Sequence, residues 1–255
     1  MAEVITVVSG SGGMGKSFVA CNLAAGLRKL GRKVLLIEAS FGLRCNDIIT
    51  GIRPETMFTL GDVLSSECSP EEAITLSENP DLPDFIQASP KLLSGEIYPI
   101  KRLTRKVFKQ YHTIIIDSAV PGDVLFEDSC RAADRVLVVC NDSPIAVRNA
   151  AHCVNHIRSF SSCRIYTVLN NVVVNGDGSC IEDVIDEISA ELIGIIPHDE
   201  YVKGSMENGD LIYRYNTFAG RSLENVVKRL TCLNVPDYET GIESGFFNKN
   251  KLLLK

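Results

Sequence analysis

The chain has 255 residues, a formal net charge of −6, 45% hydrophobic residues and nine cysteines. The acidic balance argues against a nucleic-acid partner, no apolar run is long enough to span a bilayer, and a signal-peptide pattern is missing. Because no C-x-x-C pair occurs and most cysteines lie in apolar or helical stretches, we expect buried thiols and a cytoplasmic location.

A β-branched run at Val4–Val8 predicts a buried parallel strand at the start of the chain. Residues 10–17 then fit the phosphate-loop motif G-x-x-x-x-G-K-[ST], and apolar residues at helical spacing follow. At such a strand-to-helix turn, backbone N–H groups and the helix N-terminus attract a phosphate, and Lys16 adds a full charge. A chance match is the alternative, but the context favours ATP binding. The expected contacts are Ser11, Gly12, Gly13, Met14, Gly15, Lys16, Ser17 and Phe18.

Two further apolar runs end in a carboxylate. The run Lys33–Ile37 is followed by Glu38, and the run at 113–116 is followed by Asp117. Four apolar residues and then Asp is the Walker B pattern, in which the carboxylate holds Mg²⁺. We therefore expect Ser17 and Asp117 to be the metal ligands, with ATP and Mg²⁺ as cofactors.

The remaining strands are predicted by apolar runs at 84–88, 135–140, 165–170 and 192–196, with helical patterns after each except the run at 165–170. Strands that alternate with helices imply right-handed crossovers and a mostly parallel sheet. The expected fold is a single doubly wound α/β domain over residues 1–234, with a tail at 235–255.

Several motifs together resemble the MinD/ParA family of P-loop ATPases over residues 2 to about 231, in matching order. The matching residues are the phosphate loop, Phe41-Gly42-Leu43-Arg44 with Asp47, Ile115-Ile116-Asp117-Ser118, Gly194-Ile195-Ile196-Pro197 with Asp199, and Ala219-Gly220-Arg221. The resemblance implies an ATP-dependent homodimer with nucleotide between the subunits. It also implies a switch region after each of the strands that end at Glu38 and Asp117.

The chain departs from the family pattern at three places. The family carries a second lysine early in the loop, which touches the partner subunit's nucleotide, and this chain has Ser11 there. In the first switch, the family pattern D-x-D-x-G-L-R has Ser40 in place of the carboxylate that orients water. Hydrolysis should then be slow unless Glu38 or Asp47 substitutes, so the catalytic residues would be Lys16 with one of these two. The second switch, ending at Gly122, is one residue longer than in the family.

The resemblance also implies a pocket for the base. Asn170 stands at the position that reads the purine, and Pro197 and Asp199 stand in the loop that covers the ring. Relatives often have arginine where this chain has Asn171. An asparagine at a strand end is by default a turn residue, and both interpretations of Asn170 stay open.

The C-terminal segment 245–255 places Phe246, Phe247, Leu253 and Leu254 on one flank of a helix beside three lysines. Such a segment would bind an anionic membrane surface weakly and would need a second signal such as dimerisation. The family has an amphipathic membrane-targeting tail at this place. A frayed or self-docked terminus is an equal alternative.

Three other groups carry less weight. His152 and His156 are four residues apart with Cys153 between them, but no other ligand pair accompanies them. Lys101, Arg105 and Lys109 line one side of a predicted helix, which we interpret first as a solvated face. Cys130 is similar in place to a cysteine of iron–sulfur ATPases, without the partner motif.

Two functions follow from the resemblance. The first is a nucleotide-switched dimer for spatial regulation at the membrane, such as division-site placement, which recruits a regulatory or cargo protein and has low ATPase activity. The second is a nucleotide-binding scaffold of the same fold with little or no ATPase activity.

Overall fold

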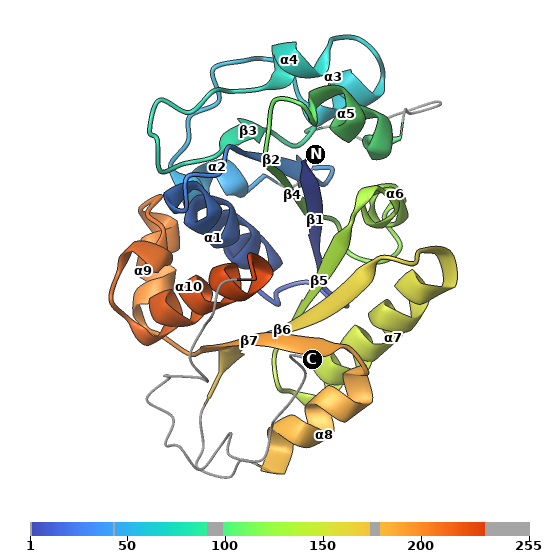
Figure 1. The fold of residues 1–255 in the computed structure, drawn as a ribbon, viewed down its shortest axis with the longest axis vertical. Helices are drawn as coiled ribbons and strands as arrows, with labels where there is room; N and C mark the ends of the chain where they lie inside the picture. Colours follow the sequence, from blue (N-terminus) through green and yellow to red (C-terminus); the bar gives the residue numbers. More distant parts are fainter. Residues whose placement is uncertain (1, 43, 91–98, 174–178, 233–255) are drawn as a thin grey trace.

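In the computed structural model, which describes residues 2–42, 44–90, 99–173 and 179–232, seven strands form one parallel sheet with helices on both faces (Figure 1). The strands are β1 (Glu3–Val8), β2 (Val34–Ala39), β3 (Asp84–Ile86), β4 (Thr113–Ser118), β5 (Arg135–Cys140), β6 (Arg164–Val172) and β7 (Glu191–Pro197). Their order is β3-β2-β4-β1-β5-β6-β7, and each neighbouring pair is parallel. The predicted doubly wound sheet is confirmed.

The helices differ greatly in length. They are α1 (Lys16–Lys29), α2 (Asn46–Thr50), α3 (Leu60–Leu64), α4 (Pro70–Ala73), α5 (Ile100–Val107), α6 (Val124–Ala132), α7 (Pro144–Phe160), α8 (Ser179–Ile188), α9 (Tyr201–Glu207) and α10 (Phe218–Leu230), with the 3-10 turn η1 (Ile212–Arg214). In Figure 1, α1 and α10 lie together on one face of the sheet, and α6, α7 and α8 lie on the other.

Strand residues alternate between the two helical layers, which explains the continuous apolar runs. In β2, Leu36 packs into the cluster that contains α1 and α10, whereas Leu35 and Ile37 pack into the cluster with α3 and α5. All six residues of β2 and all six of β4 are buried. A strand covered on both faces needs apolar side chains in both directions, so its sequence shows no polar alternation.

The prediction that no helix follows the strand at 165–170 is wrong, because α8 occupies Ser179–Ile188. Val184 and Ile188 lie four residues apart, and both are buried against α7 and its neighbours. The stretch after the strand is long enough for a ten-residue helix as well as a loop.

The predicted helix with Lys101 and Lys109 is present as α5, but α5 ends at Val107, before Lys109.

Close backbone packing joins α2 to α9. Gly51 follows α2 with a φ of 70°, and Gly209 follows α9 with a φ of 66°. A Cβ atom on Gly51 would lie 2.6 Å from the Gly209 carbonyl oxygen, so a side chain does not fit at this contact. The two helix ends therefore touch backbone to backbone.

No helix in the described part of the chain is long and apolar enough to cross a membrane. The tail at 235–255 lies outside the described residues, as does the boundary predicted at 234. Both stay predictions.

Candidate functional site

The phosphate loop connects β1 to α1 at the carboxyl edge of the sheet. Gly13 and Gly15 have φ values of 78° and 82°, in the left-handed region that favours glycine. α1 begins at Lys16, and Gly15 at its N-cap has no side chain to satisfy the first N–H groups of the helix. These N–H groups and the helix dipole make the turn suitable for an anion.

Lys16 and Asp117 form an ion pair in this site. Lys16 Nζ lies 2.8 Å from Asp117 Oδ1, and the Asp117 side chain is 2% exposed. β1 and β4 are adjacent, with Val7 opposite Asp117, which brings the end of β4 beside the loop. The two residues predicted from separate motifs thus meet directly.

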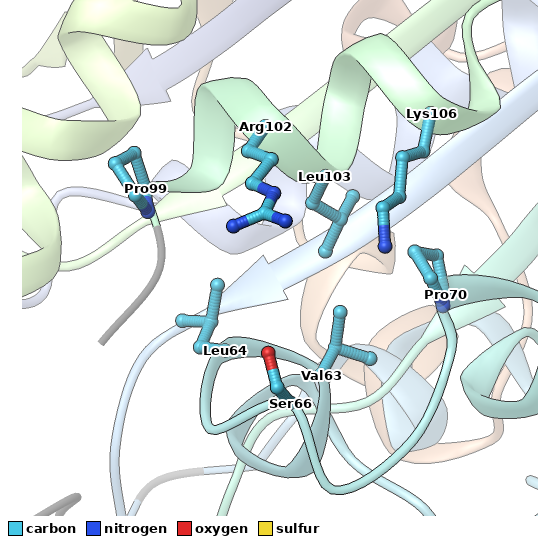
Figure 2. Close-up of a pocket in the computed structure, with 8 residues that line it drawn as sticks. All are labelled: Val63, Leu64, Ser66, Pro70, Pro99, Arg102, Leu103 and Lys106. Atoms are coloured by element: carbon cyan, nitrogen blue, oxygen red, sulfur yellow. The ribbon is translucent and has the colours of Figure 1, made fainter. Parts of the chain in front are cut away.

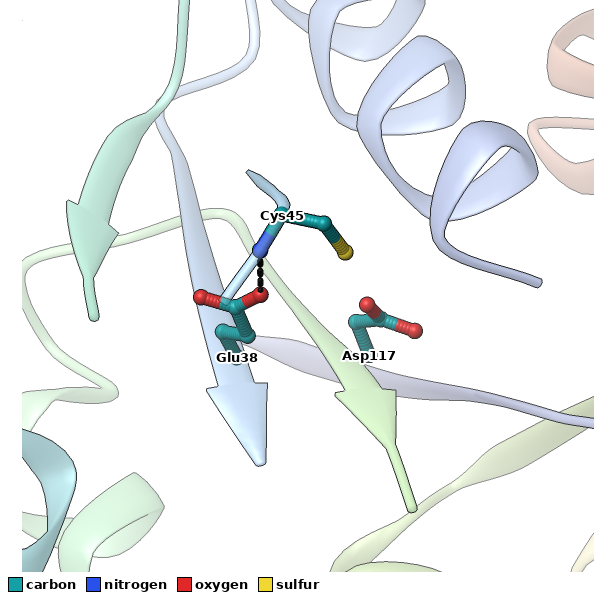
Figure 3. Close-up of side chains that lie close together, drawn as sticks. All are labelled: Glu38, Cys45 and Asp117. Atoms are coloured by element: carbon teal, nitrogen blue, oxygen red, sulfur yellow. Dashed lines mark hydrogen bonds between the residues drawn. The ribbon is translucent and has the colours of Figure 1, made fainter. Parts of the chain in front are cut away.

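Glu38 fixes the segment that follows β2. Its Oε1 atom accepts hydrogen bonds from the backbone N–H groups of Cys45 (2.7 Å, Figure 3) and Asn46 (3.1 Å). Its Oε2 atom accepts a longer one from Ala88 (3.4 Å). Burial raises the pKa of Glu38, although the backbone N–H groups act in the opposite direction. This carboxylate is engaged by the chain itself.

Asp47, the other expected substitute for the missing carboxylate, lies in the first turn of α2. Its Oδ2 atom is 2.9 Å from the Arg44 guanidinium, and its Oδ1 atom accepts from the Ile48 N–H group. Ser40 is partly exposed. The structure therefore separates the two candidates: Glu38 is buried as an anchor, and Asp47 lies nearer the surface in an ion pair.

The start of the loop has a local arrangement around Ser11. The Ser11 carbonyl oxygen accepts a hydrogen bond of 2.8 Å from Ser9 Oγ, and Ser11 itself is partly exposed. Gly12 and Gly13 are exposed.

In the second switch, Gly122 has a φ of 97° and Asp123 caps α6 through the Leu125 N–H group.

A pocket of about 330 Å³ lies next to the phosphate loop and continues the same edge of the sheet. Its walls come from the loop, from the ends of β5, β6 and β7, and from α9. They consist of Gly13, Met14, Gly15, Phe18, Asn141, Asn170, Asn171, Ile196, Pro197, His198, Asp199, Val202, Lys203 and Met206. This volume lies in the usual range of small-molecule pockets.

Asn170 ties the pocket to the phosphate loop. Its Nδ2 atom donates a hydrogen bond of 3.0 Å to the Met14 carbonyl oxygen. A Cβ atom at Gly15 would overlap the same amide, so a side chain there would displace Asn170 in addition to straining the left-handed backbone. Asn170 therefore contacts the loop through its Nδ2 atom, and it also lines the pocket.

The expected covering loop has its own anchors. Asp199 accepts from the Tyr201 N–H group (3.0 Å) and the Ala219 N–H group (3.2 Å), which joins the loop to α9 and α10. Asn171 has a φ of 60°, and its Oδ1 atom lies 2.8 Å from His198 Nδ1.

Sequence reasoning did not single out Asn141, His198 or the α9 residues of the pocket. Asn141 follows β5 directly. Because residues that follow parallel strands meet at one edge of the sheet, Asn141 could have been predicted as a pocket residue. The α9 contribution of Val202, Lys203 and Met206 depends on a loop path that no local pattern specifies.

The other groups from the sequence do not form comparable sites. His156 stacks near Phe126 (5.9 Å between ring centroids) and lies 3.3 Å from Glu127. Cys130 and Cys153 are buried, and burial raises the pKa of both thiols. Among the described residues, one group of three metal-capable side chains lies close together, and it contains neither histidine nor Cys130.

The cationic face of α5 is exposed, while Ile100, Leu103 and Val107 are buried. Figure 2 shows Arg102 and Lys106 beside a small hollow between α5 and α3. The hollow holds about 20 Å³, room for about one water molecule. It is not a ligand pocket.

The phosphate loop, the acidic strand end and the adjoining pocket define a P-loop nucleotide-binding protein of the doubly wound α/β class. The family model described as an AAA domain matches residues 2–171. The chain accordingly belongs to the MinD/ParA family of P-loop ATPases.

Similar proteins include the septum site-determining protein MinD of Thermotoga maritima, 29% identical over 263 residues, with 100% of this chain and 95% of that protein covered. MinD of Synechocystis is 28% identical over 248 residues, covering 92% of each chain. A MinC:MinD cell division complex from Aquifex aeolicus has a TM-score of 0.82 and 26% identity, covering 93% of this chain and 99% of that one. MinD of Pyrococcus horikoshii, solved with Mg-ADP, shares the fold at a TM-score of 0.78 and 19% identity, covering 90% and 96%.

Proposed function

We propose that this chain is a MinD-like ATP-binding protein that acts as a nucleotide-switched homodimer in spatial regulation at the membrane. The observation that carries the proposal is the continuity of the phosphate loop, the Lys16–Asp117 pair and the 330 Å³ pocket along one edge of the sheet. Such an edge can hold a phosphate chain at one end and a base at the other.

Magnesium fits the residues at the phosphate end. The Ser17 hydroxyl and the Asp117 carboxylate offer the hard oxygen donors that Mg²⁺ takes together with phosphate oxygens. The bound ion would supply charge neutralisation for the phosphates. Lys16, which pairs with Asp117 in this structure, would turn its ammonium group toward the nucleotide.

The test is isothermal calorimetry of Lys16→Ala with Mg-ATP and Mg-ADP. Removing the ammonium group that pairs with Asp117 should abolish measurable binding. Lys228→Ala is the matched control, because Lys228 forms a surface ion pair with Glu224 and should leave the binding heat unchanged. Equal affinities for Lys16→Ala and the native chain would remove the assignment.

A nucleotide-binding scaffold with little or no ATPase activity is the second candidate. It is favoured by Ser11 and Ser40 at the positions of a lysine and an aspartate, and by the engagement of Glu38 with backbone N–H groups. Steady-state phosphate release, measured with and without anionic vesicles, separates the two. Turnover stimulated by vesicles supports the switch, and phosphate release at the background rate under both conditions supports the scaffold.

The homodimer, the recruited protein and the membrane attachment are further parts of the proposal. They are supported by similarity to MinD proteins, including the Aquifex aeolicus MinC:MinD complex. Co-sedimentation with anionic and neutral vesicles should compare the full chain with one that ends at Glu243. Equal sedimentation of both on anionic vesicles would eliminate residues 244–255 as the anchor.

A further inference from the structure

Three side chains with different donor chemistry converge beside the phosphate loop. Glu38, Cys45 and Asp117 each offer one ligand atom, and these atoms all lie within 4.8 Å of one another. Figure 3 shows Glu38 on β2, Asp117 on β4 and, between them, Cys45, which directly precedes α2. Glu38 is 1% exposed and Asp117 is 2% exposed, so two of the three side chains are already removed from water.

The geometry of this cluster is fixed in advance. Hydrogen bonds from the backbone N–H groups of Cys45 and Asn46 hold the Glu38 carboxylate in place. The Cys45 sulfur lies within 4.8 Å of a carboxylate oxygen of Glu38 and of one of Asp117. The three donors therefore require little rearrangement to meet at one ion.

Asn46 provides a separate observation at the sulfur. Its side chain is fully buried, and its Nδ2 atom has no hydrogen-bond partner among the described residues. The Oδ1 atom of the same amide lies 3.5 Å from Cys45 Sγ. Rotating the amide by half a turn would bring Nδ2 to the sulfur, where it can donate a full hydrogen bond to a thiolate but only a weak one to a thiol. Burial raises the pKa of the free Cys45 thiol to about 12, so the thiolate would form only when a cation replaces the proton, and the unsatisfied donor on the neighbouring amide could then stabilise it.

We propose that Glu38, Cys45 and Asp117 form a binding site for a soft divalent cation of the Zn²⁺ class, with Asn46 as the hydrogen-bond partner of the thiolate. Zn²⁺ accepts thiolate and carboxylate ligands together, and three protein ligands leave a fourth position for water or a phosphate oxygen. Mg²⁺ and Ca²⁺ prefer oxygen donors alone, so Cys45 is the residue that selects between the classes.

Cation binding at this site would release the proton of the Cys45 thiol. The Cys45 S–H bond breaks, a sulfur–metal bond forms, and the proton passes to the buffer. Lys16 opposes the cation, since its ammonium group is 2.8 Å from Asp117 Oδ1. Removing that ammonium group should tighten the site.

One consequence rests on the proposed function. Asp117 is also the expected Mg²⁺ ligand, so the soft cation and Mg-nucleotide would compete for one carboxylate. Zn²⁺ would then inhibit nucleotide binding, and the inhibition would depend on Cys45.

The experiment is a titration of the full reduced chain, without nucleotide, with Co²⁺ as a spectroscopic substitute for Zn²⁺. A cobalt–thiolate bond gives a near-ultraviolet charge-transfer band that oxygen ligands do not give. Cys45→Ser should remove this band, and Glu38→Gln should weaken Co²⁺ binding by at least about tenfold. The control is Cys68→Ser, a partly buried cysteine in the segment between α3 and α4, which should retain the native band.

Lys16→Ala separates this inference from the proposed function. That variant should lose nucleotide binding but bind Co²⁺ more tightly than the native chain. A band that survives in Cys45→Ser, or the absence of a band in the native chain, would overturn the metal site and leave the nucleotide assignment standing. A Cys45-dependent band in a chain that binds no nucleotide would support the metal site and overturn the proposed function.

Discussion

The phosphate loop and the segment after β2 lie at the same edge of the sheet but differ in what they offer a ligand. The phosphate loop presents backbone N–H groups and the Lys16 ammonium toward the crevice. In the segment after β2, Glu38 uses its carboxylate to hold Cys45 and Asn46, and Ser40 stands where the family has an aspartate. Under the proposed function, nucleotide binding and hydrolysis would depend on separate loops, so binding could persist where hydrolysis is lost.

The largest expected effect is at Gly15, in the phosphate loop. Gly15→Ala should lose nucleotide binding and cost about 1–2 kcal/mol of stability from the left-handed backbone alone, with a further cost from overlap with Asn170. Gly12→Ala is the control, because a Cβ atom there meets nothing within 4 Å. Calorimetry and thermal unfolding of both variants measure the difference. Normal nucleotide affinity in Gly15→Ala would show that the observed loop conformation is not the one that binds.

The next effect concerns the anchor of the segment after β2. Glu38→Ala leaves three backbone N–H groups without their acceptor, and we expect a loss of about 2–3 kcal/mol. Asp47→Ala removes only a partly exposed ion pair and should cost less than about 1 kcal/mol. Urea unfolding at neutral pH compares them. Equal stabilities would show that the Glu38 hydrogen bonds do not hold the segment.

The effect of Glu38→Ala should depend on pH. Burial raises the pKa of Glu38 above its ordinary value of 4.5, so the folded state binds the proton more tightly than the unfolded chain does. This contribution to stability is fully present below pH 4.5 and is lost as the pH rises through the folded-state pKa. The stability difference between the native chain and Glu38→Ala should therefore be larger at pH 4 than at pH 8. A difference that shrinks on acidification would contradict the assigned direction.

Restoring the two family residues at positions 11 and 40 tests whether their absence slows ATP hydrolysis. Ser11→Lys with Ser40→Asp restores a cation and a carboxylate, and turnover should rise by about tenfold or more, since each charged contact contributes roughly 1.5–3 kcal/mol. Each single variant serves as the comparison for the pair. If the double variant hydrolyses ATP no faster than the native chain, the two serines do not limit the rate.

The smallest effect is expected at the base end of the crevice. Asn170→Ala removes the bond to the Met14 carbonyl oxygen and the acceptor for the base, and should weaken ATP binding by about 1–2 kcal/mol. Asn171→Ala should change the affinity less, because its Oδ1 atom contacts His198. Competition titrations of ATP against GTP would show whether Asn170 selects the base. Unchanged selectivity would leave Asn170 with only its contact to the loop.

The parts predicted well from the sequence are those set by local chemistry. β5 occupies the predicted range at 135–140. This range could be predicted because a strand that is buried on both faces has a continuous apolar sequence. The two motifs and the rule that parallel strands end at one edge predicted that Lys16 and Asp117 lie at the same crevice, although their direct ion pair was not predicted.

Other features depend on distant contacts. α2, α3 and α4 are only four or five residues long, too short for a periodic pattern to identify. The engagement of Glu38 with Cys45 and Ala88 joins residues up to 50 positions apart, and no spacing in the sequence indicates it. The same holds for α9 as a wall of the pocket.

The contact between Gly51 and Gly209 has a mechanical consequence. Gly51 ends the helix that begins at Asn46, and Gly209 follows the helix that lines the pocket with Val202 and Met206. With no side chains between them, the two helix ends cannot slide past each other without a backbone collision. A displacement of the segment held by Glu38 should then move α9 as well. The pocket lined by α9 should therefore change its width whenever that segment moves. In hydrogen exchange, the amides of α2 and α9 should slow together when nucleotide binds.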